Sequence, residues 1–160
     1  MMKSLDLGCG AYPKNPFDAD FLYGVDIRDD IDKNVKKSDL VTEALPFDDN
    51  YFDFVTAFDV IEHIPRIIYA PNRIYPFVNL MNEIYRVLKN GGKFLSHTPA
   101  YPYAEAFRDP THVNIITNET FPLYFDDQNR LANMYGFNGS FRIESQQWYG
   151  PHLISILVKN

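Results

Sequence analysis

Acidic residues and glycines stand at the ends of the first apolar runs of the chain, in a spacing suited to holding a nucleoside. The segment LDLGCG places Gly8 and Gly10 directly after an apolar run that contains Asp6. Two glycines let the backbone turn sharply and approach a ligand with no Cβ in the way. Asp26 ends the next run, where a carboxylate can accept hydrogen bonds from both ribose hydroxyls. Asp39 closes the third run, where an adenine edge would lie.

Each of these features taken alone has an ordinary explanation. A G-x-G sequence is often only a tight turn, and a single acidic residue is more often a solvated charge. Acidic residues at three consecutive strand ends, together with the glycine turn, favour a nucleoside site over these explanations.

The residues after the glycine turn favour S-adenosylmethionine over NAD. A dinucleotide-binding turn reads G-x-G-x-x-G and opens a helix whose N-terminus holds the pyrophosphate. Here Pro13 occupies the third glycine position, and Pro13 and Pro16 interrupt the short segment before the next strand. The turn has Asp6 beside it and no neighbouring Lys or Arg in the sequence, which suits a cationic ligand better than a diphosphate.

Alternating strand and helix patterns predict the elements that position these residues. We expect strands at residues 4–8, 21–27, 35–40, 52–58 and 93–97, helices at 76–88 and 120–135, and a final hairpin of 141–149 with 152–159. The sequence Asn90-Gly91-Gly92 predicts a left-handed helix end. This order predicts an α/β fold: a doubly wound, mostly parallel, Rossmann-like seven-stranded sheet that ends in an antiparallel hairpin. Ligands of such sheets bind beyond the carboxyl ends of the strands.

Composition limits the remaining possibilities. With 160 residues, 46% of them hydrophobic, the chain suits one globular domain. A single cysteine excludes a disulfide framework, and no apolar run is long enough for a membrane span. The net charge of −6 argues against a broad nucleic-acid-binding face. We therefore expect a cytoplasmic protein without nucleic-acid or membrane partners.

The motifs resemble those of the class I S-adenosylmethionine-dependent methyltransferases, of the small, short-loop, methyltransferase type 11-like kind. LDLGCG resembles their glycine motif, YGVDI their ribose-binding strand end, and SDL their adenine-contact segment. ALPFDDNYFDFVTAFDVIEHI resembles their fourth-strand block, and NEIYRVLKNGGKFL resembles the block that contains the fifth strand. The resemblance covers about residues 4–99. It implies a single domain, residues 1–160, that lacks the family's usual N-terminal helices.

The resemblance also implies roles for individual residues. Gly8 and Gly10 would back the methionine portion of the cofactor, and Asp6 would reach its ammonium group. Asp26 would bind the ribose, and Asp39 the adenine. The full expected cofactor set is Asp6, Gly8, Cys9, Gly10, Asp26, Ile27, Asp39, Leu40, Phe58 and Asp59.

The methyl acceptor has weaker signals. His63 follows the fourth strand, where it could be a general base, although a packed or capping histidine is an ordinary alternative. Asp109 and His112 belong to a D-P-T-H element in the long loop after the fifth strand, which resembles an element of small methyltransferases linked to sugar pathways. An Asx turn that only shapes the loop is the alternative there. The histidines have no metal-ligand spacing, so we expect no metal site.

The sequence thus predicts a methyltransferase that acts on an unidentified acceptor, of small-molecule or sugar type. A non-catalytic cofactor-binding module, or a subunit of a larger complex, is the alternative. The expected lack of N-terminal helices leaves apolar surface uncovered and predicts a homodimer.

Overall fold

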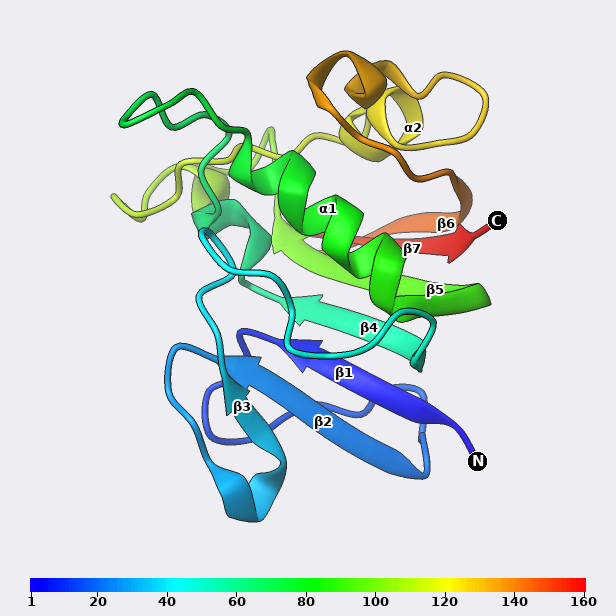
Figure 1. Ribbon diagram of the computed structural model, residues 1–160. Coiled ribbons are helices and arrows are strands. Elements are labelled where there is room, and N and C mark those ends of the chain that lie inside the picture. Colours follow the sequence, from blue (N-terminus) through cyan, green and yellow to red (C-terminus); the bar gives the residue numbers. More distant parts are fainter.

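The computed structural model describes residues 1–160, and its centre is a seven-stranded sheet in the order β3-β2-β1-β4-β5-β7-β6 (Figure 1). The strands are β1 (Lys3–Leu7), β2 (Phe21–Asp26), β3 (Val35–Lys37), β4 (Phe52–Phe58), β5 (Leu88–Pro99), β6 (Phe141–Tyr149) and β7 (His152–Lys159). Strands β1 to β5 pair in parallel, whereas β7 runs antiparallel to both β5 and β6. The predicted fold class is confirmed.

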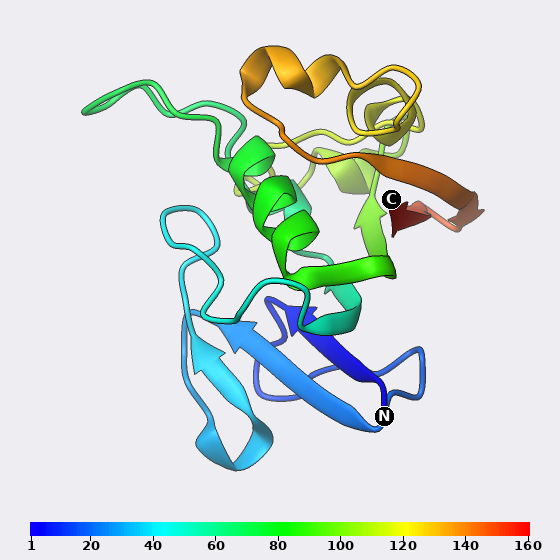
Figure 2. The same ribbon diagram turned by 45° about the vertical axis from the view of Figure 1, so that its right-hand side comes forward.

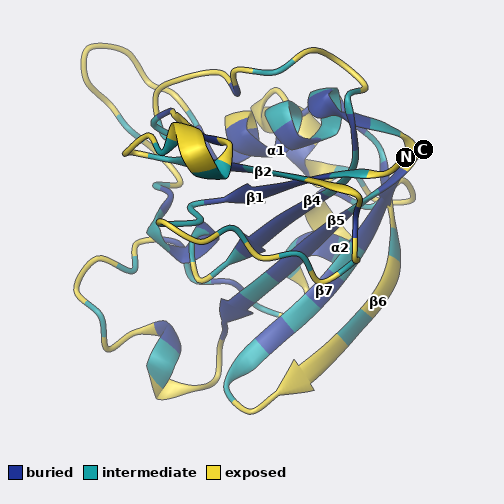
Figure 3. Ribbon diagram, turned by 90° about the horizontal axis from the view of Figure 1, so that it is seen from below, coloured by how far each residue is buried: buried dark blue, intermediate teal, exposed yellow.

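The register of the parallel strands brings their carboxyl ends to one edge of the sheet. Leu7 at the end of β1 lies opposite both Val25 of β2 and Ala57 of β4. The last four residues of β1 are all buried, because neighbouring strands flank it and chain covers both of its faces (Figure 3). The segments that follow β1, β2 and β4 therefore start side by side.

One long helix covers a face of the sheet. Helix α1 (Pro76–Val87) lies across this face (Figures 1 and 2). It begins with proline in its first turn and buries an apolar stripe that includes Leu80, Met81 and Ile84. It ends one residue earlier than expected, because Leu88 is already extended and starts β5. The predicted left-handed residue is present at Gly91 (φ 76°), but it bends β5 instead of ending the helix.

The other parallel crossovers contain no α-helix. Residues 8–20 join β1 to β2 as a loop, as the two prolines predicted. Phe17 of this loop stacks on Phe54 of β4, with ring centroids 4.3 Å apart. Three short 3₁₀ helices lie in the connections between strands: η1 (Ile31–Lys33) between β2 and β3, η2 (Ile61–His63) between β4 and α1, and η3 (Ala104–Ala106) after β5.

The prediction of one continuous helix at residues 120–135 is wrong. The chain forms α2 (Thr120–Tyr124) and the 3₁₀ helix η4 (Leu131–Tyr135), with a turn between them. The carboxylate of Asp126 causes the break, because it accepts hydrogen bonds from the backbone of Gln128 and of Ile143 in β6. Arg130 then takes a left-handed conformation (φ 47°) that a continuous helix does not allow.

Aromatic side chains fill much of the space between helices and sheet. Beside α1 they form a cluster of Phe77, Tyr85, Phe121, Phe125, Phe137 and Phe141. The edge strand β6 is in contrast largely exposed (Figure 3). None of the helices has the length and apolar character that crossing a bilayer requires.

Candidate functional site

The two motif glycines both adopt left-handed backbone conformations, but their surroundings differ. Gly8 has φ 60° and Gly10 has φ 59°. A Cβ added to Gly8 would lie 2.4 Å from Cγ2 of Val60, so the packing of the chain itself requires glycine there. A Cβ added to Gly10 would meet only Nη2 of Arg28, at 3.8 Å. Open space therefore lies over Gly10, where a ligand can approach the backbone.

Asp6 is 2% exposed, and both of its carboxylate oxygens have partners within the fold. Oδ1 accepts a hydrogen bond from the hydroxyl of Thr56 (2.7 Å), and Oδ2 accepts one from the backbone amide of Lys14 (2.8 Å). Burial raises the pKa of the Asp6 carboxyl, against the effect of these hydrogen bonds. Asp6 thus anchors the loop after the glycine turn, and a contact with the cofactor's ammonium group stays a prediction.

Asp26 also holds the glycine turn. Its Oδ2 accepts a hydrogen bond from the amide of Gly10 at 2.8 Å, and its Oδ1 lies 3.4 Å from Nε of Arg28. The fold therefore brings a cation beside the turn that is absent from its sequence neighbours. Lys14, in the segment directly after the turn, is a second cation of this region: its backbone amide donates to Asp6, and its Nζ lies 4.4 Å from the ring centroid of Phe58. The reasoning that the turn lacks positive charge was wrong.

The remaining expected cofactor residues lie at the same edge of the sheet. Ile27 follows β2 and is 70% exposed, which leaves an apolar side chain free to cover a purine face. Asp39 closes a turn after β3, where Oδ1 accepts a hydrogen bond from the amide of Val41, while Leu40 packs into the core. Burial raises the pKa of the Cys9 thiol to about 11, so this thiol stays protonated.

These residues fit S-adenosylmethionine. The open surface over Gly10 would accommodate the methionine portion, a lone pair on Oδ2 of Asp26 would be left for a ribose hydroxyl, and Ile27 would offer an apolar surface to the adenine. Arg28 and Lys14 would supply positive charge for the cofactor's carboxylate. Each assignment stays a prediction at the level of the single residue.

A polar pocket of about 280 Å³ lies beyond the ends of β4 and β5. Apart from Pro99, every side chain that lines it is charged or an imidazole. Its lining residues are Asp59, Glu62, His63, Pro99, Glu105, Arg108, Asp109, His112 and His152. The fold therefore brings the three predicted catalytic residues, His63, Asp109 and His112, together in one place.

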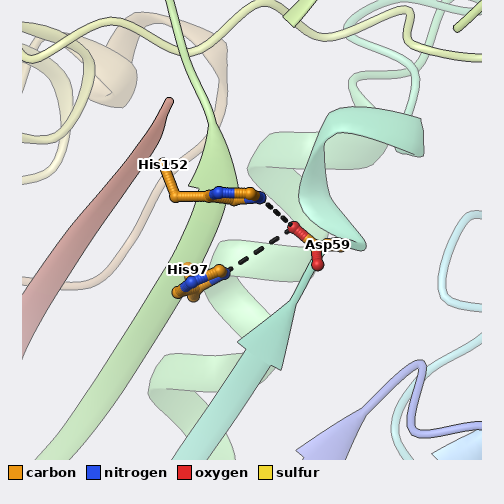
Figure 4. A group of neighbouring side chains, drawn as sticks. All are labelled: Asp59, His97 and His152. Atoms are coloured by element: carbon orange, nitrogen blue, oxygen red, sulfur yellow. Dashed lines mark ion pairs between the residues drawn. The ribbon is translucent and has the colours of Figure 1, made fainter. Parts of the chain in front are cut away.

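One side of the pocket carries a carboxylate that faces two stacked histidines, drawn in Figure 4. Oδ1 of Asp59 lies 2.9 Å from Nε2 of His152 and 3.7 Å from Nδ1 of His97. The two imidazole rings stack with centroids 4.3 Å apart. Burial, followed by the charge of His152, lowers the pKa of His97. Asp59 has φ 54°, so the chain turns sharply where β4 ends.

The other side of the pocket carries Glu62, His63 and His112. The His63 and His112 rings meet edge to face, with centroids 4.7 Å apart. Nδ1 of His112 lies 3.2 Å from the carbonyl oxygen of Ala106, whereas its Nε2 lies 3.9 Å from Asp109. The Ala106 carbonyl therefore orients the His112 ring. Burial raises the pKa of the Glu62 carboxyl, although Thr98 donates a hydrogen bond to it.

Asp109 mainly closes its own loop. Its Oδ1 accepts hydrogen bonds from the backbone amide and the hydroxyl of Thr111, and these bonds lower the pKa of Asp109. The first of them is the Asx turn considered as the alternative for this element. Asp109 nevertheless also faces the pocket.

Sequence reasoning missed several residues of the site. Glu62, His97 and His152 were not predicted to act there, although β5 carries His97 near its carboxyl end, where such sheets bind ligands. His152 reaches the site because it lies opposite Pro99 in the β5–β7 pairing. Gly24 in β2 was also missed. A Cβ there would lie 2.5 Å from Sγ of Cys9, so the packing beside the glycine turn requires glycine at this position. The expectation of no metal site rested on spacing along the chain, and the fold brings the four histidines into two groups, each of two histidines with one carboxylate, despite that spacing.

The sheet order, the glycine turn and the acidic strand ends define the class I S-adenosylmethionine-dependent methyltransferases. The model of the methyltransferase domain family, type 11, matches residues 5–96, which is more than half of the chain. The chain belongs to this family, and it is an S-adenosylmethionine-dependent methyltransferase. No curated protein matches the sequence.

Solved structures with the same fold share little sequence identity with the chain. An S-adenosylmethionine-dependent methyltransferase from Archaeoglobus fulgidus superposes with a TM-score of 0.60 at 18% identity, over 99% of this chain and 86% of that one. One from Aquifex aeolicus gives 0.60 at 16% identity, over 98% and 81%. A complex of the Haloferax volcanii Trm112 methyltransferase activator with a methyltransferase gives 0.62 at 14% identity, over 99% and 82%. At these identities the likeness concerns the fold.

Proposed function

We propose that the protein transfers a methyl group from S-adenosylmethionine to a small, hydroxyl-rich acceptor of sugar type, bound in the polar pocket. The observation that carries the proposal is the lining of the pocket, which apart from Pro99 consists of carboxylates, imidazoles and one guanidinium. Such groups pair with hydroxyls, whereas a lipid or an aromatic acceptor needs an apolar surface. The pocket also begins at Asp59, directly after the predicted cofactor residue Phe58.

The chain's own residues would hold both reactants and manage one proton. When bound, S-adenosylmethionine supplies an electrophilic methyl group. The cofactor would be held at the strand ends by Asp26, Gly10 and Ile27. The polar pocket would hold the acceptor hydroxyl nearby. Orientation of this kind supplies much of the rate acceleration. Because Nδ1 of His112 faces a carbonyl oxygen, which only accepts hydrogen bonds, Nδ1 carries the ring proton and Nε2 can take the proton of the acceptor hydroxyl.

An acceptor panel tests this proposal. The protein is incubated with S-adenosylmethionine and with sugars, nucleotide sugars, phenols, fatty acids or peptides, and S-adenosylhomocysteine is measured. We expect turnover with hydroxyl-rich acceptors. Turnover confined to phenols, fatty acids or peptides would contradict the proposed acceptor class.

The alternative that the chain works within a larger assembly also has structural support. The Haloferax methyltransferase is found with an activator protein, and the edge strand β6 of this chain exposes Trp148 and Tyr149. A homodimer through this edge would cover the same side chains. Light scattering and the activity assay together distinguish the cases. A doubled mass in light scattering supports the homodimer. A monomeric mass, with turnover only after a partner is added, supports the subunit role.

A further inference from the structure

We propose that Glu62, His63 and His112 bind a divalent transition-metal ion in the polar pocket. One ligand atom from each residue belongs to a group in which all atoms lie within 4.8 Å of one another. Glu62 and His63 come from the 3₁₀ turn after β4, and His112 comes from the long loop after β5. The backbone holds these two segments together, since the amides of Val113 and Asn114 donate to the carbonyl oxygen of Glu62.

Glu62 supplies an oxygen that has no partner in the protein. The residue is 1% exposed, and its Oε2 accepts a hydrogen bond of 2.9 Å from the hydroxyl of Thr98. Its Oε1 is buried and makes no hydrogen bond. A buried carboxylate oxygen without a donor or a cation is destabilising, and buried charges in proteins are normally paired or coordinate metals. The protein supplies no donor to this oxygen.

The hydrogen bonds of His63 fix which of its nitrogens is available. Nδ1 of His63 lies 2.9 Å from the hydroxyl oxygen of Thr111. That hydroxyl has one proton, which it donates to Oδ1 of Asp109 at 2.7 Å, because a carboxylate only accepts. The Thr111 oxygen must therefore accept from Nδ1–H of His63. Nε2 of His63 is left with a free lone pair.

His112 reaches the same state through a different partner. Its Nδ1 lies 3.2 Å from the carbonyl oxygen of Ala106, which can only accept, so Nδ1 carries the proton and Nε2 the lone pair. A histidine that donates one ring N–H to a carbonyl, or to a hydroxyl backed by a carboxylate, has the outer-shell arrangement found around protein metal ligands. Both histidines have it.

The donor set selects the kind of ion. Two neutral imidazoles and one carboxylate suit Zn²⁺, Fe²⁺ and their first-row neighbours, whereas Mg²⁺ and Ca²⁺ prefer oxygen ligands. Three protein ligands leave coordination positions open. Those positions would face the pocket in which we place the acceptor, so the bound ion would hold and polarise an acceptor oxygen. With the ion bound, Nε2 of His112 is a ligand and not a base, and the ion would instead lower the pKa of the acceptor hydroxyl so that its proton leaves to water. This role rests on the proposed function, whereas binding of the ion does not.

The second carboxylate–histidine group, Asp59 with His97 and His152, is less suited to an ion. Asp59 and His152 already form a close pair at 2.9 Å, and the Asp59 side chain is 51% exposed to water. This group provides the control for the experiment.

The experiment measures Zn²⁺ binding to the metal-free full chain by calorimetry, with Co²⁺ as a second probe whose visible absorption reports its coordination. We expect one ion per chain. Glu62→Gln should lower the affinity by more than the roughly 10- to 100-fold typical of an outer-shell change, whereas His152→Gln should leave it close to that of the unaltered protein. Absence of binding overturns the proposal. Loss of binding in His152→Gln with retention in Glu62→Gln overturns it as well.

Thermal melting controls for folding and gives an independent readout. The side-chain amide that Glu62→Gln introduces can keep the hydrogen bond from Thr98 without burying a charge, so the metal-free variant should melt no lower than the unaltered protein. Zn²⁺ should raise the melting temperature of the unaltered protein and of His152→Gln only. If Glu62→Gln fails to fold, Thr111→Val replaces it and should lower Zn²⁺ affinity about 10- to 100-fold; unchanged affinity in Thr111→Val overturns the proposal. Metal binding without turnover of any hydroxyl-rich acceptor would contradict the proposed acceptor class and leave the metal site standing.

Discussion

Alanine substitutions at Gly8 and Gly10 should have different consequences, although the two positions look equivalent in the sequence. Both have φ near 60°, so either alanine adopts a left-handed conformation that costs about 1–2 kcal/mol. At Gly8 the new Cβ would also lie 2.4 Å from Cγ2 of Val60, far inside the separation at which carbon atoms attract. Overpacking of this kind adds about 1–3 kcal/mol. Gly8→Ala should therefore destabilise the fold by about 2–5 kcal/mol, and Gly10→Ala by about 1–2 kcal/mol.

Removing Val60 tests the cause. In the Gly8→Ala background, Val60→Ala deletes the clashing Cγ2 and leaves only Cβ of residue 60, at 3.0 Å from the new methyl group. The double variant should recover about 1–3 kcal/mol relative to the sum of the single changes. The left-handed strain remains, because Val60 does not cause it.

Urea unfolding of the unaltered protein, of the three single variants at Gly8, Gly10 and Val60, and of the double variant measures these free energies, and calorimetry with S-adenosylhomocysteine measures binding. Gly10→Ala should stay folded and bind the cofactor weakly, because its methyl group occupies the open surface over the turn. Two results would refute the reasoning. One is equal stability of Gly8→Ala and Gly10→Ala, and the other is additive behaviour of the Gly8 and Val60 substitutions.

Three further predictions follow from the hydrogen bonds and the charges of the site and of the core. Asp26→Ala should lower cofactor affinity about 10- to 150-fold in calorimetry and also loosen the glycine turn, because Asp26 accepts from the amide of Gly10; unchanged affinity in a folded variant would exclude the ribose role. His112→Asn should lower turnover about 10²- to 10⁴-fold without changing cofactor affinity, and retained turnover per folded molecule would remove His112 from the mechanism. The ion pair with Arg86 lowers the pKa of Glu83 below 4.5, so its carboxylate stabilises the fold above that pH and loses this effect as the pH falls through the lowered pKa. Urea unfolding between about pH 6 and pH 3 should show this loss in the unaltered protein and a flatter profile in Glu83→Gln.

The local signals in the sequence were sufficient for the fold class and the cofactor. An apolar run, a glycine turn and an acidic strand end are contiguous patterns, and parallel strands place their carboxyl ends at one edge wherever such patterns recur. The helix at residues 120–135 failed because its break comes from Asp126 bonding to a strand 17 residues further along the chain. The reasoning about charge failed because Arg28 reaches the glycine turn through space.

The sequence by itself therefore determined the sheet, the turn after β1 and the kind of cofactor, because each depends on neighbouring residues. Only the tertiary structure decided how the acceptor side is built. Asp59, Glu62 and His63 follow β4, His112 belongs to the loop after β5, and His152 begins β7. These residues meet because the β4–β5 and β5–β7 pairings fix where those segments leave the sheet. The register of these pairs is a long-range property, so the spacing of the residues along the chain does not predict their contact.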